Sequence, residues 1–390
     1  MNILLFTHSM AGGGAERTVA TLANHWADAG WEVTVATLAP QSEDFYDLRP
    51  GVRRSVLGLA GDSGSPLVAA LQNLRRIQAL RRLLAHLRPQ VALAMMSTPS
   101  VLLALAGHGM PGLVRVGSER CYPPHAPLAW PWSSARRHTY GRLDAVVALT
   151  GECRRWIATQ TSARSVPVIP NAVAWPLPSA APWIVPNAVV APARRVLLAV
   201  GRLDPVKNFG GLLAVFARLS GRHPDWDLVI LGDGPERPAL QAARTAWGLA
   251  GRVHLPGIAG NVGQWHERCD LFVLASHSEG FPNALAEALC HGMPVVSVDC
   301  DTGPRDIVRH GVDGLLVAPG NPDALEQALD ALMGNCVLRQ HFAAQAADAR
   351  ERFSIERVAG MWEALFSRLE EAGAAPRRPA GVNDRGEFLS

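Results

Sequence analysis

The chain has 390 residues, 48% of them hydrophobic, which is enough for two cores, since domains usually contain roughly 100–200 residues. Its 37 basic and 34 acidic residues leave a formal net charge of +3, which argues against nucleic acid as a partner. Six cysteines without a Cys-x-x-Cys pair indicate reduced thiols, and the first residues lack the basic start of a signal peptide. We therefore expect a cytoplasmic protein.

Short apolar runs alternate with amphipathic stretches along the chain, a pattern typical of βα units in a parallel sheet. The first half predicts a helix over residues 15–29 and strands at 2–7, 32–38, 91–95, 113–117 and 145–148. The second half repeats the pattern, with strands at 195–200, 227–231, 253–255, 271–274 and 294–298. The predicted fold class is therefore α/β, with two Rossmann-like parallel-sheet domains.

Domain boundaries follow from the composition of the chain. Residues 1–168 form the predicted N-terminal domain, residues 169–193 a proline-rich linker, and residues 194–354 the C-terminal domain. A helix over 355–372 is expected to pack back on the N-terminal domain. Residues 373–390 are rich in Ala, Pro, Arg and Gly, which predicts a mobile tail.

The first predicted strand leads into a glycine loop at residues 12–14. Gly13 and Gly14 allow a phosphate or a sugar to approach the backbone at the start of the following helix. The loop lacks the Gly-x-Gly-x-x-Gly spacing of dinucleotide sites, which argues against NAD.

The strongest chemical signal is a pair of carboxylates that follows the strand at 271–274. Glu279 lies before a helix that Pro282 can start, and Glu287 lies just over a turn inside that helix. One carboxylate can hold a transferred sugar while the other holds a ribose, and the helix start offers N–H groups to a diphosphate. Alternatively, Glu279 is a first-turn acid and Glu287 a solvated helix position.

A second signal follows the strand at 195–200. Arg202 and Lys207 can converge on a departing pyrophosphate, where Arg forks onto the oxygens and Lys acts as a point charge. Such a pair can supply the charge that Mg²⁺ supplies elsewhere. The alternative is an ordinary surface loop.

Together these residues resemble the paired signatures of family 4 glycosyltransferases, in the branch that builds exopolysaccharides and lipid-linked oligosaccharides. Residues 232–235, which include Gly234, and Asn171 also lie where that family has equivalents. The resemblance implies two domains facing across a cleft (GT-B fold), a retaining mechanism without a cofactor or catalytic metal, and a nucleotide diphosphate sugar donor, with UDP as the expected nucleotide. The acceptor would be a lipid-linked saccharide or a polysaccharide precursor.

The resemblance also assigns roles to residues. Arg202 and Lys207 would bind the diphosphate, Glu287 the ribose and Glu279 the sugar hydroxyls. The remaining donor contacts would come from Gly13, Gly14, Gly234, Gly280, Phe281, Pro282 and Asn283. Two other functions stay open at this point, namely a sugar-nucleotide epimerase of the same fold and a non-catalytic nucleotide-sugar-binding protein.

The acceptor side of the cleft is expected to contain His8, Glu16, Glu119 and Arg120. Glu119 can orient an acceptor hydroxyl and Arg120 can meet a phosphate, or the two can form a buried pair without a ligand. Asp299 and Asp301 form an Asp-x-Asp sequence, but Arg202 and Lys207 already supply positive charge, so we do not predict a metal site.

A basic amphipathic helix is predicted from Leu71 to Arg88. Its apolar positions would lie on one face: Leu71, Leu74, Ile77, Leu80, Leu83, Leu84 and Leu87. Five arginines occupy the remainder: Arg75, Arg76, Arg81, Arg82 and Arg88. Such a helix can rest on an anionic membrane as a peripheral contact, or it can pack on its own sheet.

Overall fold

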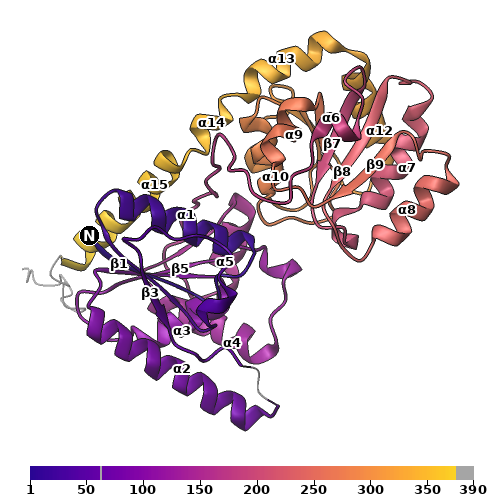
Figure 1. The fold of residues 1–390 in the computed structure, drawn as a ribbon. Helices are drawn as coiled ribbons and strands as arrows, with labels where there is room; N and C mark the ends of the chain where they lie inside the picture. The colour runs from indigo at the N-terminus through magenta and orange to yellow at the C-terminus, as the bar shows by residue number, and fades with distance from the viewer. Residues whose placement is uncertain (62–63, 375–390) are drawn as a thin grey trace, which may run out of the picture.

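A computed structural model describes residues 1–61 and 64–374. In this part of the chain the strands form two six-stranded parallel sheets, one in each half (Figure 1). The predicted class, α/β with two Rossmann-like parallel-sheet domains, is confirmed.

The N-terminal sheet has the strand order β3-β2-β1-β4-β5-β6. Its strands are β1 (Asn2–Thr7), β2 (Glu32–Thr37), β3 (Arg53–Val56), β4 (Val91–Met95), β5 (Val114–Ser118) and β6 (Ala145–Val147). The helices of this domain are α1 (Gly14–Asp28), α2 (Pro66–Leu87), α3 (Ser97–Ala106), α4 (Trp130–Thr139) and α5 (Gly151–Gln160).

The C-terminal sheet has the order β12-β11-β10-β7-β8-β9. Its strands are β7 (Arg195–Val200), β8 (Trp226–Leu231), β9 (Val253–Gly257), β10 (Leu271–Leu274), β11 (Val295–Val298) and β12 (Gly314–Val317). Its helices are α7 (Phe209–Ser220), α8 (Arg237–Ala246), α9 (Val262–Arg268), α10 (Asn283–Cys290), α11 (Pro304–Ile307), α12 (Pro322–Gly334), α13 (Cys336–Ala346) and α14 (Ala349–Arg352).

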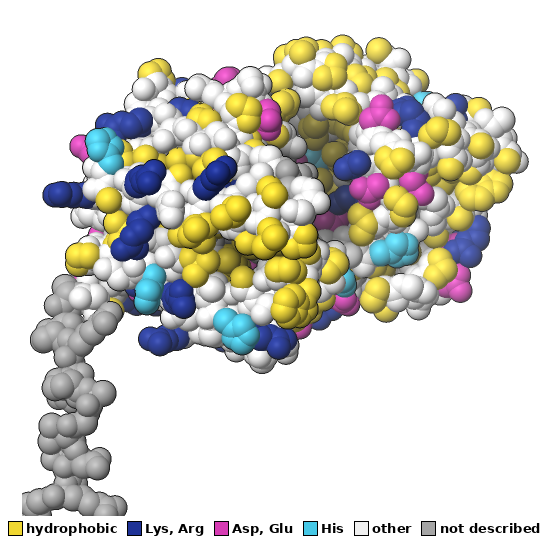
Figure 2. All heavy atoms as spheres, turned by 90° about the horizontal axis from the view of Figure 1, so that it is seen from below, with side chains coloured by type: hydrophobic (Ala, Val, Ile, Leu, Met, Phe, Trp, Pro, Cys, Tyr) yellow, Lys and Arg dark blue, Asp and Glu magenta, His cyan; other side chains and the backbone are white. Residues whose placement is uncertain are grey.

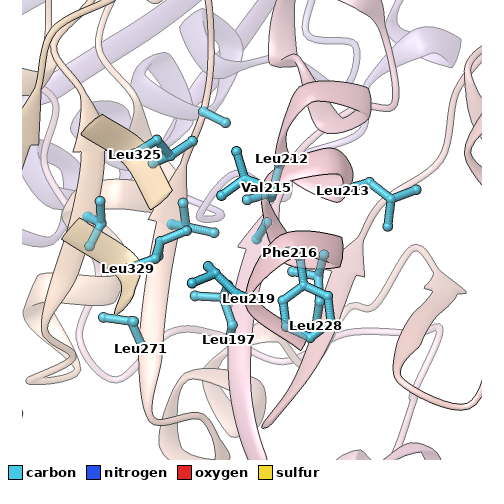
Figure 3. Close-up of a cluster of buried hydrophobic side chains, with 14 of the residues drawn as sticks. Leu197, Leu212, Leu213, Val215, Phe216, Leu219, Leu228, Leu271, Leu325 and Leu329 are labelled. Atoms are coloured by element: carbon cyan, nitrogen blue, oxygen red, sulfur yellow. The ribbon is translucent and has the colours of Figure 1, made fainter. Parts of the chain in front are cut away.

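Both faces of each sheet are covered. Successive strand residues point to opposite sides, so neighbours in one strand belong to different buried clusters. In β1, Ile3 and Leu5 belong to one buried cluster, while Leu4 and Phe6 belong to another. The second sheet is covered in the same way. Figure 3 shows one of its clusters, in which Phe216 of α7 and Leu329 of α12 lie over the strands.

The segment predicted as a linker is packed rather than extended between the domains. Ile169 and Val173 are buried, and Pro186–Val189 forms the short helix α6. The indole nitrogen of Trp265 donates to the Ile184 carbonyl at 3.0 Å, which fastens this segment to the C-terminal domain.

The last helix, α15 (Ile355–Ala374), returns from the C-terminal domain and lies along α1 (Figure 1). Its Trp362 and Phe366 are part of the N-terminal core, and Trp26 of α1 donates to Glu363 at 3.0 Å. Apart from its first two residues, which continue this helix, the tail predicted at 373–390 lies outside the described residues.

Helix α2 differs from the single apolar face that the sequence predicted. Leu80 and Leu84 are buried, whereas Leu71 and Leu74 are at least half exposed. Arg76 and Arg81 donate to backbone carbonyls of their own domain, at Leu59 and Ala106 respectively. The amino-terminal half of α2 is therefore an apolar surface with arginines beside it. Within residues 1–61 and 64–374, no helix combines the length and apolarity that crossing a bilayer requires.

Candidate active site

The two domains meet at the carboxyl ends of their strands, where parallel α/β sheets bind ligands. In each sheet the strand order reverses beside one strand, between β1 and β4 and between β7 and β10. The glycine loop follows β1, the segment with Arg202 and Lys207 follows β7, and Glu279 follows β10. Figure 2 shows a hollow between the two halves, with basic and acidic side chains in its wall.

Lys207 and Glu279 form an ion pair where the strand order of the C-terminal sheet reverses, between β7 and β10. Lys207 Nζ lies 2.7 Å from Glu279 Oε1, and the Glu279 side chain is 9% exposed. Ser276 Oγ donates to the same oxygen at 2.6 Å, and the backbone N–H of His277 donates to the Val206 carbonyl at 2.8 Å. The two loops are therefore fixed to each other, and Glu279 is held by a cation rather than being a free first-turn acid.

Arg202 is not part of this pair. Its side chain is 74% exposed, and the acid beside it is Asp204, 3.9 Å away. The structure places Arg202 at the end of β7, as expected, but does not bring it to Glu279 or Glu287.

Glu287 faces the opposite domain. Its side chain is 9% exposed, and Arg17 Nη2 of α1 donates to its Oε1 at 2.7 Å. Glu287 is therefore not the solvated helix position of the alternative interpretation. Arg17 was not among the residues predicted for the site, although it directly follows Glu16, which was.

The start of α10 forms the second part of this interdomain contact. Asn171 Nδ2 donates to Asn283 Oδ1 at 2.8 Å, and a Cβ on Gly14 would lie 3.5 Å from Asn283 Nδ2. A Cβ on Gly280 would come 3.2 Å from the Arg120 carbonyl oxygen, so the backbones of the two domains approach closely there.

Phe281 and Pro282 shape this loop. The Phe281 ring is buried edge-on against Phe353, with 5.8 Å between ring centroids. Pro282 directly precedes Asn283, the first residue of α10, and so lies just outside the helix. Because the Phe281 side chain is buried and Pro282 has no polar side-chain atom, these two residues can offer only backbone polar groups to the hollow.

Close packing requires a glycine at position 234, where a Cβ would overlap the backbone carbonyl of Leu203. A Cβ on Gly13 would meet only the end of the Glu16 side chain, which can move aside. The Gly13 carbonyl also accepts a hydrogen bond from the Tyr46 hydroxyl at 2.9 Å. The Tyr46 hydroxyl therefore holds the glycine loop, and the Leu203 N–H, which donates to the Asp233 carbonyl at 2.9 Å, holds the 232–235 loop.

Glu119 and Arg120 do not pair with each other, which corrects that alternative. The Glu119 carboxylate, 2% exposed as a residue, accepts from Ser97 Oγ at 2.7 Å and from the Tyr140 hydroxyl, with Arg136 Nη1 at 3.9 Å. Burial raises the pKa of Glu119 above its usual value. This carboxylate is turned into the N-terminal domain and does not face the hollow.

Arg120 points toward the domain boundary. It contacts Asn171 Oδ1, and it donates to Ser118 Oγ and Thr18 Oγ1 at 3.2 and 3.3 Å. Burial lowers the pKa of Arg120 to about 10. His8, by contrast, is exposed at the end of β1, where its carbonyl accepts from the N–H groups of Leu38 and Ala39.

The sequence analysis also missed His125, which joins the domains beside Glu279. Its Nδ1 contacts Ser278 Oγ and its Nε2 lies 3.1 Å from Asp301 Oδ2. Asp299 pairs with Arg305 at 2.9 Å, so the two acids of the Asp-x-Asp sequence face different partners. No cluster of three His, Cys, Asp or Glu side chains suited to a metal occurs in the described residues.

Comparison with known proteins identifies the family. A model described as glycosyltransferase family 4 matches residues 12–174, and one described as glycosyl transferases group 1 matches residues 187–349. Together they cover both domains. The chain belongs to glycosyltransferase family 4.

Individual relatives of this family 4 chain come from polysaccharide synthesis. An exopolysaccharide phosphotransferase of Streptomyces coelicolor is 28% identical over 96% of the chain, and the chain spans 41% of that relative's length. The amylovoran biosynthesis glycosyltransferase AmsD of Erwinia amylovora is 23% identical, with 91% of this chain and 96% of AmsD covered.

Solved structures confirm the GT-B fold of the family 4 chain. The structure of HepE from Anabaena in complex with UDP superposes with a TM-score of 0.76, at 19% sequence identity, and covers 94% of this chain and 100% of HepE. At this identity the likeness establishes the fold.

Proposed function

We propose that the chain is a retaining glycosyltransferase that moves a hexose or N-acetylhexosamine from a UDP-sugar to a lipid-linked saccharide or polysaccharide precursor. The observation that carries the proposal is the Lys207–Glu279 pair at the reversal of strand order, beside the start of α10. The UDP complex of HepE supports UDP as the nucleotide, and the names of the two relatives support a polysaccharide product.

Each of the site residues has a separate role in the transfer. Glu279 accepts hydrogen bonds from the donor sugar's hydroxyls, and Glu287 accepts them from the ribose. Lys207, Arg202 and the backbone N–H groups at the start of α10 stabilise the charge that develops on the diphosphate. Arg202 is exposed, so it reaches the phosphate only by turning its side chain into the hollow.

In the reaction, the bond between the sugar's anomeric carbon and the diphosphate oxygen breaks, and a bond to the acceptor oxygen forms on the same face. The proton of the acceptor hydroxyl passes to the departing diphosphate, which retains the anomeric configuration without a covalent enzyme intermediate. Lys207, held by Glu279, and Arg202, once turned toward the diphosphate, supply the positive charge there, so we propose that neither a metal nor another cofactor is required.

The test is transfer in the presence of EDTA. The protein is incubated with labelled UDP-, GDP- and ADP-sugars and a bacterial membrane lipid extract, and nucleotide release and label transfer are both followed. We expect UDP release matched by label in the lipid or saccharide fraction, with the donor's anomeric configuration kept in the product.

Each other outcome contradicts a named part of the proposal. UDP release without any glycosylated product favours the epimerase alternative, and binding without turnover favours the non-catalytic one. Loss of transfer in EDTA, with recovery on adding Mg²⁺ or Mn²⁺, refutes metal independence. Preference for a GDP- or ADP-sugar refutes the choice of UDP.

We also propose that the amino-terminal half of α2 rests on an anionic membrane and brings the hollow to a lipid-linked acceptor. Leu67, Val68, Leu71 and Leu74 are exposed there, and Arg75 and Arg82 are exposed on the same helix. The face seen in Figure 2 mixes hydrophobic side chains with Lys and Arg. Apolar area together with basic charge is what interfacial helices use to bind anionic lipid.

The double substitution Leu71→Glu and Leu74→Glu is expected to weaken binding to vesicles of 25% phosphatidylglycerol in phosphatidylcholine about tenfold or more, since it removes two exposed leucines that would enter the lipid and adds negative charge that anionic lipid repels. Flotation of the protein with the vesicles measures this. Val337→Glu changes an exposed apolar residue on α13, away from α2, and is expected to float as the unchanged protein does. Equal flotation of the double variant would refute the membrane contact.

A further inference from the structure

The interdomain ion pair of Arg17 and Glu287 is the starting point. Arg17 belongs to the first turn of α1 in the N-terminal domain, and Glu287 belongs to α10 in the C-terminal domain. The 2.7 Å contact places a cation of one domain on a largely buried carboxylate of the other. A buried carboxylate is costly unless it is paired, so the contact favours the arrangement of the two domains seen in this structure.

Further contacts between the two domains surround this ion pair. One turn before Glu287 on α10, Asn283 accepts from Asn171, which in turn contacts Thr18, the neighbour of Arg17. Gly14 packs on Asn283 at the same place. The start of α1 therefore faces α10 directly at Gly14 and Arg17, and through Asn171 at Thr18, so the guanidinium has a defined position.

Neither partner is saturated by the contact. An ionised carboxylate offers about four acceptor positions and a guanidinium five N–H groups. Among the described residues, the Arg17 side chain makes one hydrogen bond, to Glu287 Oε1, and it is 41% exposed. A ligand with neighbouring hydroxyls can donate to the remaining Glu287 positions while Arg17 stays in place.

We infer that Arg17 is a positioning residue for the donor nucleotide, supplied by the N-terminal domain: it fixes the Glu287 carboxylate toward the ribose hydroxyls and so couples nucleotide binding to domain closure. This inference rests on the proposed function, which places the ribose at Glu287. The family resemblance assigns the ribose contact to Glu287 of the C-terminal domain, and the inference adds a role for Arg17 of the N-terminal domain.

The experiment compares UDP with 2′,3′-dideoxy-UDP by isothermal titration calorimetry. The unchanged protein is expected to bind UDP more tightly than the dideoxy nucleotide. Arg17→Ala is expected to weaken UDP binding roughly ten- to hundredfold, as for loss of a hydrogen bond between charged groups, and to weaken dideoxy-UDP much less. Arg17→Lys keeps the charge but replaces the planar guanidinium by a compact ammonium group, so its Kd for UDP should lie between those of the unchanged protein and Arg17→Ala.

Arg49→Ala is the matched control, because Arg49 belongs to the same domain and pairs with Asp28 at the other end of α1. It is expected to leave both dissociation constants unchanged. If Arg17→Ala weakens both nucleotides equally, Arg17 acts on the domains and not through the ribose, and the inference is wrong. It is also wrong if Arg17→Ala binds UDP as the unchanged protein does. An unchanged protein that binds none of UDP, GDP and ADP refutes the proposed function itself.

Discussion

Replacing Lys207 by alanine is expected to lower kcat for sugar transfer by about 100- to 1000-fold, the usual effect of removing one group that stabilises charge in the transition state. The substitution removes the cation that lies 2.7 Å from Glu279. The Glu279 carboxylate, which is only 9% exposed, then lacks its ion-pair partner. Initial rates of UDP release at saturating donor and acceptor separate this effect on kcat from an effect on KM.

The control for Lys207→Ala is a cation on β7, the strand that precedes Lys207. Arg195 lies at the amino end of β7, away from the hollow, and pairs with Asp225 at 3.4 Å, so Arg195→Ala is expected to keep full activity. Glu279→Gln keeps the shape of the side chain but removes its charge, and should also lower kcat. Wild-type turnover by Lys207→Ala would refute the role of this ion pair in the transfer.

Buried strands were predictable because their periodicity is strong. Continuous apolar runs marked β1, β4, β7 and β10, whose residues are covered on both faces of the sheets. The prediction missed β3 and β12, which lie at the edges of the two sheets. Both have four residues, and β3, with the sequence Arg-Arg-Ser-Val, is largely accessible, so neither carries a long apolar run.

The Lys207–Glu279 pair could be anticipated for a topological reason. Both residues follow strands, and β7 and β10 are neighbours in the sheet, so their carboxyl ends bring the two loops together. The contacts of Arg17 and His125 could not be derived in this way. They depend on how closely the two domains approach, which no periodicity within one domain encodes.

The tetrapeptide Pro-Asn-Ala-Val occurs twice, at residues 170–173 and 186–189. It also shows that local sequence alone does not determine structure. In residues 170–173, Asn171 is buried and joins Arg120 to Asn283, whereas Pro186–Val189 forms the helix α6. Identical tetrapeptides thus adopt different structures because their surroundings differ. Tertiary context decides the conformation of segments this short.

Glu119 gives the second large effect, on stability. Glu119→Ala is expected to lower the free energy of unfolding by about 3 to 5 kcal/mol, because it leaves the buried Arg136 without its carboxylate and two hydroxyl groups without an acceptor. Glu119→Gln keeps an oxygen for those hydroxyls and should cost less. Thermal unfolding of the three proteins, followed by circular dichroism, measures the difference.

The dependence on pH follows from the direction of the pKa shift. Burial raises the pKa of Glu119 above 4.5, so the folded chain holds this proton more tightly than the unfolded chain does. The stability that the protonated carboxyl contributes is fully present below about pH 4.5 and is lost as the pH rises through the raised folded value. Glutamine has no such proton, so the difference in melting temperature should shift in favour of Glu119→Gln as the pH is raised from 4.5 to 8. Titration of the other groups affects both proteins alike and cancels in the comparison. A difference that stays constant over this range would show that the Glu119 carboxyl does not gain its proton on folding, and that Arg136 and the two hydroxyls offset its burial.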